Sequence, residues 1–205
     1  MQLYYSPGAC SLASHIALTE AGANFGIVKV NLKDKLTESG KDFNAINPKG
    51  YVPALMLDSG ELLTENTALL GYIGELDPKA RLIPKAGTVG NLRVREWLGY
   101  INSELHKQCG PLFRPGTPEA TVQFQRELLT RRLGYVDQAL QGKSYLTGEE
   151  FTVADSYLFT VLNWAGRLQI DLTPWPNLRS FMERVKARPA VQSVLGAEGL
   201  LKPAA

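Results

Sequence analysis

Cysteine and histidine are scarce in this sequence, and long hydrophobic runs are missing from it. The 205 residues include two cysteines, Cys10 and Cys109, which lie far apart and form no CxxC pair. Neither a disulfide framework nor a thiolate zinc site is therefore available. With two histidines and no acidic cluster at ligand spacing, we expect no metal site. No apolar run approaches the roughly 18–20 residues of a membrane-spanning helix, so no membrane partner is expected.

An excess of charge of one sign is also missing. The sequence has 22 Lys and Arg residues against 20 Asp and Glu residues, which leaves a net charge of +2. With its charges so nearly balanced, the chain lacks the excess of positive charge with which a nucleic-acid-binding protein neutralises phosphates. The N-terminus has neither the basic flank nor the apolar core of a signal peptide, so we expect a cytoplasmic protein. The hydrophobic content of 44% is enough for a packed core and excludes disorder.

The first part of the chain alternates strands and helices. The patterns predict strands at 2–5, 26–32, 54–57 and 61–63, helices at 11–21 and 65–76, and a short polar segment at 34–46. A three-residue connection containing Gly60 joins the last two strands as a hairpin. A parallel crossover followed by a hairpin and a covering helix is typical of thioredoxin-like folds.

The second part consists of long stretches whose apolar residues recur with the periodicity of an α-helix. Helices are predicted at 89–107, 118–140, 156–165, 177–186 and 190–198. In the first of them, the apolar residues from Val94 to Leu105 fall on one stripe, which should face the core. Thr152 and Asp155 match a capping box in front of a helix that is nearly apolar all round. Such a helix should lie at the centre of the domain.

Residues that stop helices are concentrated between 77 and 88, which separates the two parts. The predicted fold class is therefore α+β. A thioredoxin-like domain with a mixed four-stranded sheet and helices is expected at 1–80, and an all-helical domain at 89–205. The linker between them is placed at about 81–88.

Cys10 follows a strand and a glycine-containing turn and stands immediately before a helix. Unpaired amides and the helix dipole at such a position favour an anionic sulfur and lower the thiol pKa. Cys10 is therefore a candidate reactive thiolate, and a small buried hydrophobic residue is the alternative. The same helix start could instead hold the thiolate or phosphate of another molecule, with Ser11 as hydroxyl donor. Cys109 has no such placement and is interpreted as a packing or surface residue.

Two further turns could bind a peptide-like molecule. Pro53 stands where a strand begins, and a cis peptide there would expose the backbone groups of Val52 to a ligand. An ordinary strand-initiating proline is the alternative. Glu65 and Asn66 open a helix with carboxylate and amide groups, which would suit a zwitterionic amino acid. Routine helix capping explains the same residues without a ligand.

One lateral face of the first long helix is polar with small gaps. It carries Arg95, Gly99, Asn102, Ser103 and His106. This face could border a ligand cleft or a subunit interface, with His106 as a hydrogen-bond donor or proton carrier near neutral pH. A solvated helix face is the alternative. The other histidine, His15, lies inside the first helix without an identifiable partner.

Four segments together resemble bacterial beta-class glutathione S-transferases. They read YYSPGACSL at 4–12, NPKGYVPAL at 47–55, LTEN at 63–66 and SELHK at 103–107. The segments FTVAD at 151–155 and AEGL at 197–200 fit the same family, so the resemblance runs through the whole chain. It implies a thioredoxin-like domain that binds glutathione, a helical domain that borders a site for a small hydrophobic electrophile, and a homodimer.

The resemblance also implies roles for individual residues. Cys10 would contact the glutathione sulfur and could form a mixed disulfide with it, while Val52 before a cis Pro53 would pair with the cysteinyl backbone. Glu65 and Asn66 would hold the γ-glutamyl end. The remaining implied glutathione contacts are Tyr5, Ser11, Lys35 at the glycyl carboxylate, Ser103, Glu104 and His106. Cys10 and His106 are assigned to catalysis, and Lys107, Phe113 and Trp164 to the electrophile site.

At three positions the sequence departs from the family. Asn66 stands where a serine is common, which keeps a polar side chain and the backbone amide. Gly99 and Ser103 stand where similar relatives often place asparagine and aspartate to contact glutathione across the dimer. Losing a hydrogen bond to a charged group costs about 1.5–3 kcal/mol. Weaker glutathione binding is therefore expected unless Asn102 or Glu104 substitutes.

The implied activity is conjugation of glutathione, as co-substrate, to hydrophobic electrophiles. Since the glutathione sulfur is the nucleophile, Cys10 need not attack the substrate. A second hypothesis is glutathione-dependent reduction of disulfides or peroxides, or reductive dehalogenation, through a mixed disulfide on Cys10. A third is a carrier that binds ligands without turnover.

Overall fold

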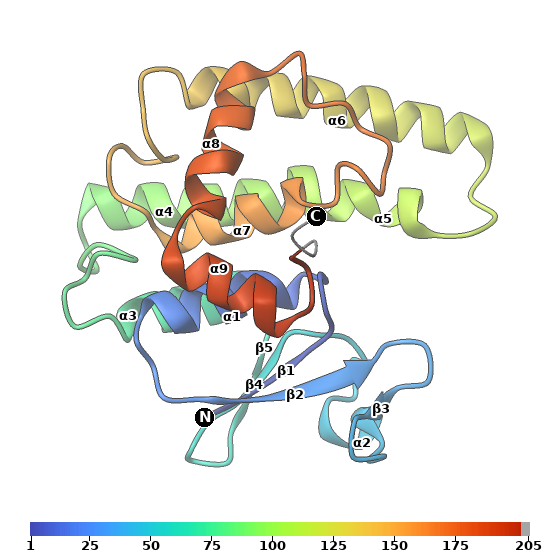
Figure 1. Cartoon of the computed structure of the whole chain (residues 1–205), viewed down its shortest axis with the longest axis vertical. Coiled ribbons are helices and arrows are strands. Elements are labelled where there is room, and N and C mark those ends of the chain that lie inside the picture. The colour runs from blue at the N-terminus through green and yellow to red at the C-terminus, as the bar shows by residue number, and fades with distance from the viewer. Residues whose placement is uncertain (202–205) are drawn as a thin grey trace.

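A mixed five-stranded sheet forms one end of the molecule in this computed structural model, which describes residues 1–201 (Figure 1). The strands are β1 (Gln2–Tyr5), β2 (Gly26–Asn31), β3 (Leu36–Thr37), β4 (Ala54–Met56) and β5 (Leu62–Thr64), in the order β3-β2-β1-β4-β5. Strands β1 and β2 are parallel, and the other pairs are antiparallel. The prediction of four strands was one short, because the two residues of β3 are too few to show an alternating pattern.

Helices cover the sheet on the side that faces the rest of the chain. Helix α1 (Ser11–Glu20) and helix α3 (Asn66–Glu75) lie between the sheet and the helical part (Figure 1). The short α2 (Phe43–Ile46) falls in the segment expected to be only polar, and the carboxylate of Asp42 caps it by accepting from the Asn44 N–H at 2.8 Å. A small cluster packs together around the sheet apart from the main core: Tyr4, Val30, Phe43, Val52 and Ala54.

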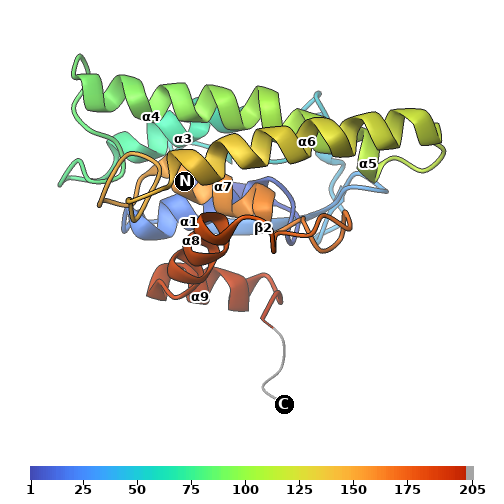
Figure 2. The same ribbon diagram turned by 90° about the horizontal axis from the view of Figure 1, so that it is seen from above.

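The helical part comprises α4 (Val89–Tyr100), a π-helical turn η1 (Ile101–His106), α5 (Lys107–Phe113), α6 (Glu119–Ala139), α7 (Val153–Leu162), α8 (Pro176–Lys186) and α9 (Pro189–Ala197). Helices α4, η1 and α5 form one long rod with α6 alongside it (Figures 1 and 2). The helix predicted at 89–107 is therefore interrupted by a π-helical turn and runs on to Phe113. Such turns are frequent at functional sites.

Helix α7 is the centre of the helical part, as predicted. All ten of its residues are buried, and it contacts α1, α3, α4 and α8. The capping box is confirmed: Asp155 Oδ2 accepts from the backbone N–H and from the hydroxyl of Thr152, each at 2.8 Å. One large hydrophobic cluster includes residues of both parts of the chain, so the sheet's covering helices and α7 share a core.

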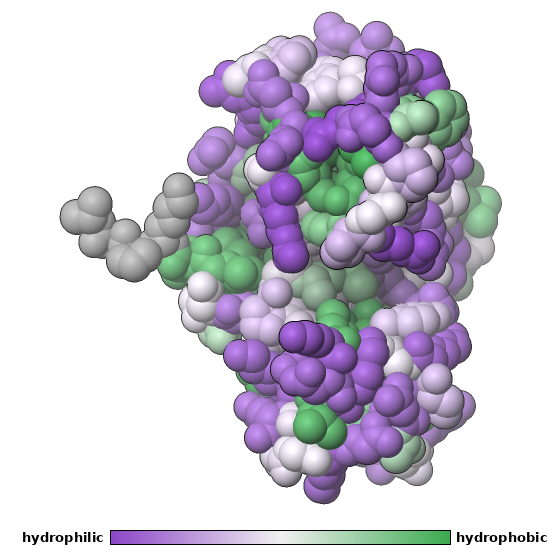
Figure 3. Space-filling model, turned by 90° about the vertical axis from the view of Figure 1, so that its right-hand side faces the viewer, coloured by the Kyte–Doolittle hydropathy of each residue, from purple (hydrophilic) through white to green (hydrophobic). Residues whose placement is uncertain are grey.

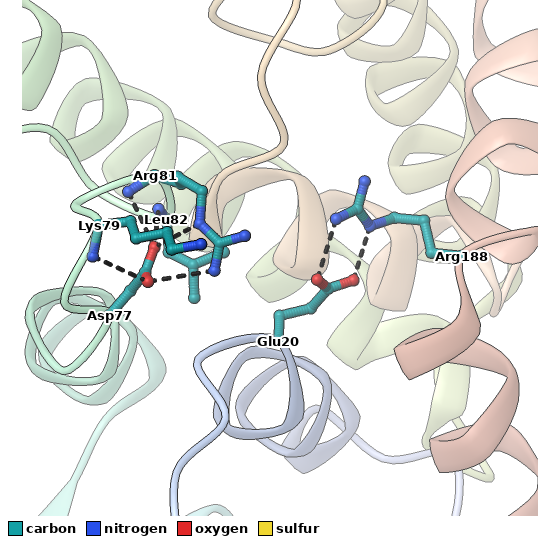
Figure 4. A network of polar contacts seen from close by, with 6 residues as sticks. All are labelled: Glu20, Asp77, Lys79, Arg81, Leu82 and Arg188. Atoms are coloured by element: carbon teal, nitrogen blue, oxygen red, sulfur yellow. Dashed lines mark hydrogen bonds and ion pairs between the residues drawn. The ribbon is translucent and has the colours of Figure 1, made fainter.

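Polar contacts hold the segment after α3 and the start of α9 (Figure 4). The carboxylate of Asp77 accepts from the backbone N–H groups of Lys79, Arg81 and Leu82 and from the Arg81 guanidinium. Arg188 reaches Glu20 on α1 with two hydrogen bonds of 2.6 and 2.9 Å. These contacts fix loops that the sequence identifies only as places where helices stop.

Candidate functional site

A cavity of about 170 Å³ lies between the sheet domain and the rod of α4, η1 and α5. From the first part of the chain, its wall is formed by Cys10, Tyr51, Val52, Pro53, Glu65 and Asn66. From the helices it receives Asn102, His106, Lys107 and Tyr157. Three loops singled out from the sequence therefore meet at one place, opposite the polar face of the first long helix.

Cys10 caps the N-terminus of α1, as predicted, but its thiol is not acidic. Its Sγ donates to the Val52 carbonyl oxygen at 3.0 Å. Burial raises the pKa of Cys10 to about 12, although the backbone amides of Cys10 and Ser11 and the charge of Lys107 act to lower it. Of the two interpretations of Cys10 that the sequence left open, this pKa favours the small buried residue over the thiolate, because desolvation outweighs the helix N-terminus.

The turn before β4 contains a cis peptide bond between Val52 and Pro53, as the sequence suggested. At the start of α3, Glu65 has a positive φ of 70°, and its Oε1 accepts from Lys49 Nζ at 2.7 Å and from the Tyr51 hydroxyl at 2.8 Å. These two hydrogen bonds lower the pKa of Glu65, so the carboxylate is charged at neutral pH. The negatively charged Glu65 side chain is therefore held beside the N-terminus of α3.

His106 ends the π-helical turn and faces the same cavity. Its Nδ1 lies 2.6 Å from the hydroxyl oxygen of Tyr157, and that hydroxyl donates to Asn102 Oδ1 at 3.1 Å. Burial, with a smaller effect from Lys107, lowers the pKa of His106 to about 4. The imidazole is therefore neutral at pH 7.

A second, more open groove of about 610 Å³ adjoins the cavity and shares Cys10, His106 and Lys107 with it. Phe113 and Trp164 line this groove in an edge-to-face pair, with ring centroids 5.5 Å apart. Figure 3 shows the hollow between the two halves of the molecule, with hydrophobic side chains inside and hydrophilic ones around it. The groove therefore offers an aromatic surface next to the smaller polar cavity.

Models of two domain families match this chain: the glutathione S-transferase N-terminal domain over residues 1–75 and the C-terminal domain over residues 97–189. The glutathione S-transferase GstA of Escherichia coli O157:H7 is 47% identical over 98% of this chain and 100% of its own length. The chain belongs to the glutathione S-transferase family. The predicted fold class and family are thereby confirmed.

Solved structures of the family support the class. A bacterial beta-class glutathione S-transferase from Sphingomonas chungbukensis has 46% identity and a TM-score of 0.94, covering 98% of this chain and all of that one. A sphingomonad glutathione S-transferase complexed with glutathione has 44% identity, the same TM-score and the same coverage. The resemblance to the beta class is therefore confirmed.

Five of the glutathione contacts that the family implies lie outside both cavities within residues 1–201. Tyr5 is in the core against His15, and the hydroxyl of Ser11 bonds to the backbone of Ser6. Lys35 donates to the Gly50 carbonyl oxygen at 2.7 Å. The other two are Ser103, whose hydroxyl donates to the Gly99 carbonyl oxygen, and Glu104, which pairs with Arg132 at 2.7 Å. Their roles toward glutathione stay predictions.

Asn102 and Glu104, the two substitutes that the sequence offers for the missing contacts of positions 99 and 103, lie in different surroundings. Asn102 lines the smaller cavity, whereas Glu104 points to Arg132. Asn102 therefore lines the cavity of its own chain, and a contact from this position across the dimer stays a prediction.

Tyr157 is a site residue that sequence reasoning missed. It was assigned to the apolar central helix, and it is indeed fully buried there. A signal was present, since a buried tyrosine hydroxyl needs a hydrogen-bond partner. Its partners come from η1, 51 and 55 residues away in the chain, which a helical period cannot show.

The described residues show neither a metal cluster nor a membrane span. Within residues 1–201, no three His, Cys, Asp or Glu side chains group closely enough to hold an ion. Across the same residues, no helix combines the length and the apolar character needed to cross a bilayer.

Proposed function

We propose that this chain is a glutathione S-transferase that holds glutathione in the smaller cavity and transfers its sulfur to a small hydrophobic electrophile in the adjoining groove. The observation that carries this proposal is the wall shared by the two spaces, formed by Cys10, His106 and Lys107. A thiol bound at this junction meets both the polar groups that ionise it and the substrate that it attacks.

The γ-glutamyl and cysteinyl parts of glutathione have matching groups in the cavity, and the family implies a third contact from outside it. The charged Glu65 and the α3 N-terminus suit the ammonium and carboxylate of the γ-glutamyl residue. Val52 offers its backbone to the cysteinyl residue, and the Val52 carbonyl retains a lone pair beside the Cys10 thiol. In the family, Lys35 would reach the glycyl carboxylate. These assignments extend to a homodimer in which the outer face of α4 and α6 meets a second copy.

The test is glutathione-dependent turnover of a halonitroarene by the purified protein, with the uncatalysed rate subtracted and the glutathione concentration varied. The proposal expects a rate that saturates with glutathione. No turnover, despite a rise in melting temperature with glutathione, would favour a ligand carrier and overturn the proposal.

Cys10 supports a second candidate, glutathione-dependent reduction through a mixed disulfide. Its sulfur lies in the wall of both spaces, where it could exchange with a glutathione disulfide or an adduct. Cys10→Ser should abolish that reaction while leaving conjugation to halonitroarenes in place. The two activities can therefore be separated with one variant.

A further inference from the structure

The hydroxyl of Tyr157 is the centre of a hydrogen-bond network whose directions can be assigned. A tyrosine hydroxyl carries one proton to donate and two lone pairs to accept with. Asn102 Oδ1, at 3.1 Å, can only accept, so the single proton of Tyr157 goes to Asn102. Any other neighbour at hydrogen-bond distance must then donate to Tyr157.

Asn66 has its own orientation fixed from the other side. Its Nδ2 donates to the Cys10 carbonyl oxygen at 3.0 Å, and its Oδ1 accepts from the Ser14 hydroxyl at 3.0 Å. A carbonyl oxygen cannot donate, so the amide nitrogen must face Cys10. Burial raises the pKa of Tyr157 while Asn66 acts to lower it, which fits an amide nitrogen, rather than a carbonyl oxygen, on the side of the hydroxyl.

The remaining neighbour is His106, whose Nδ1 lies 2.6 Å from the Tyr157 oxygen. We propose that Tyr157 and Asn102 are positioning residues that hold His106 as the tautomer protonated on Nδ1. The other ring nitrogen, Nε2, then presents a lone pair to the thiol of bound glutathione. That last step rests on the proposed function, whereas the tautomer is a property of the protein without ligand.

The proton inventory of the step is simple. The glutathione S–H bond breaks as an Nε2–H bond forms, and the negative charge of the adjacent thiolate stabilises the imidazolium that burial disfavours in the free protein. The sulfur electron pair then forms the bond to carbon, and a halonitroarene releases its halide. The imidazolium returns its proton to water. No oxidant or reductant is involved.

The groups around the His106 ring favour a neutral imidazole in the free protein. The positive charge of Lys107 disfavours the imidazolium and the negative charge of Glu65 favours it, while burial is the larger effect. Cys10 and Tyr157 face the ring as neutral groups, because burial raises the pKa of each. Arg114 and Arg167 line the adjoining groove. A tautomer is therefore well defined at pH 7, where the ring has one proton.

The test is long-range nitrogen–proton NMR correlation on the full chain labelled with ¹⁵N-histidine, at pH 7 and without glutathione. The sequence contains two histidines, so the spectra are simple. His15 serves as an internal reference, because its Nδ1 lies 2.8 Å from the Glu198 carboxylate and must carry a proton there. We expect the Nδ1-protonated pattern for His106 as well. An Nε2-protonated His106 would overturn the inference.

Three variants separate positioning from simple structural damage. Asn102→Leu removes the oxygen that accepts the Tyr157 proton, so that this proton turns to Nδ1 and the His106 proton moves to Nε2. Asn102→Asp keeps an acceptor and should keep the wild-type tautomer. The matched control is Tyr145→Phe, since Tyr145 is also buried and its hydroxyl bonds to Arg188 far from the cavity. An unchanged tautomer in Asn102→Leu would contradict the proposal.

Kinetics then test the consequence for the reaction. Tyr157→Phe and Asn102→Leu should lower kcat by about tenfold or more, within the range of general base catalysis, with a smaller change in the KM for glutathione. The apparent pKa of the bound thiol, followed by thiolate absorbance, should rise in both. If the tautomer is as inferred but no electrophile is turned over, the proposed function fails and the tautomer assignment stands. If kcat in Tyr157→Phe and Asn102→Leu equals that of the wild type, the tautomer of His106 has no role in the reaction.

Discussion

The Cys10 thiol and the Val52 carbonyl oxygen are 3.0 Å apart and joined by a hydrogen bond, with the sulfur as donor. This contact ties the N-terminus of α1 to the residue before the cis proline. The contact also indicates that Cys10 is protonated, because a thiol can donate to a carbonyl oxygen and a thiolate cannot. Cys10, which the sequence marks as a candidate reactive thiolate, is therefore a neutral hydrogen-bond donor in the free protein.

Cys10→Ala should retain conjugation of glutathione to a halonitroarene and lose the mixed disulfide. The nucleophile in conjugation is the sulfur of glutathione, and the raised pKa of Cys10 leaves almost no thiolate to compete with it. Steady-state rates and intact-protein mass after incubation with oxidised glutathione measure the two effects. The second cysteine, Cys109, is buried and should add no glutathione in either protein. Loss of glutathione binding in Cys10→Ala would contradict this division of roles.

Alkylation provides a direct measure of the Cys10 pKa. With a pKa of about 12, the thiolate fraction at pH 8 is on the order of a thousandfold smaller than for an ordinary thiol of pKa about 8.5. Iodoacetamide should therefore modify Cys10 far more slowly than it modifies free glutathione at the same pH. Modification as fast as that of glutathione would show that the helix N-terminus outweighs burial after all.

Glu65→Gln should raise the KM for glutathione by about tenfold or more and change kcat little, because hydrogen bonds to charged groups contribute about 1.5–3 kcal/mol. Glu65 would lose its charge while Lys49 and Tyr51 lose a strong acceptor. The matched control is Glu61→Gln, an exposed residue just before β5. The proposed γ-glutamyl contact is wrong if the two variants behave alike.

The same carboxylate gives the glutathione affinity a pH dependence. Hydrogen bonds from Lys49 and Tyr51 lower the pKa of Glu65, so its charge persists below the ordinary range of a glutamate. Affinity for glutathione should therefore remain level from pH 7 down to about pH 4.3, the usual glutamate value, and fall only at lower pH. Isothermal titration across this range measures it. A decline that begins near pH 6 would identify another titrating group.

The sequence predicts the local parts of the site and misses the parts that depend on tertiary contact. The loops around Cys10, Pro53 and Glu65 are recognisable because turns, caps and helix starts are set by neighbours in sequence. The pKa of Cys10 cannot be predicted in this way, because its burial depends on residues distant in the sequence, among them Val52, which lies 42 positions along the chain. Tyr157 was missed for the same reason: a helical period shows that a face is buried and not which polar atom lies opposite.

Asp77→Asn should lower the free energy of unfolding by about 1.5–3 kcal/mol at neutral pH, the range for hydrogen bonds to a charged acceptor. Burial acts to raise the pKa of Asp77, but hydrogen bonds from Arg81 and from backbone N–H groups outweigh it and hold the pKa at about 2. In the unfolded chain the value is about 3.9. The folded state therefore binds this proton less readily, and the stabilisation present above about pH 4 is lost as the pH falls through about 2.

Urea unfolding of wild type and Asp77→Asn between pH 7 and pH 2 measures that contribution as a difference. The difference should be constant down to about pH 4 and shrink toward zero near pH 2. Glu150→Gln is the control, because Glu150 is an exposed carboxylate outside the Asp77 network. A wild-type advantage that stayed constant to pH 2 would mean that Asp77 keeps its ordinary pKa in the folded protein.

The outer face of α4 and α6 carries exposed apolar and aromatic side chains that a second copy would cover. Val89 and Leu92 on α4 are 70% and 60% exposed. Beside them, Trp97, Tyr100 and Tyr135 line a hollow of about 470 Å³. Large exposed apolar residues on adjacent helices are typical of protein interfaces. We therefore expect the wild-type protein to sediment with twice the mass of one chain.

Leu92→Glu should weaken this dimer, because the substitution buries an unpaired carboxylate at the contact. Leu36→Glu is the matched control, since Leu36 is also exposed but lies on β3, at the far edge of the sheet. Sedimentation velocity over a range of protein concentrations should give a larger monomer fraction for Leu92→Glu and a wild-type profile for Leu36→Glu. If the wild-type protein sediments as a monomer, the proposed homodimer is wrong, and so is any contact of glutathione with α4 of a second copy.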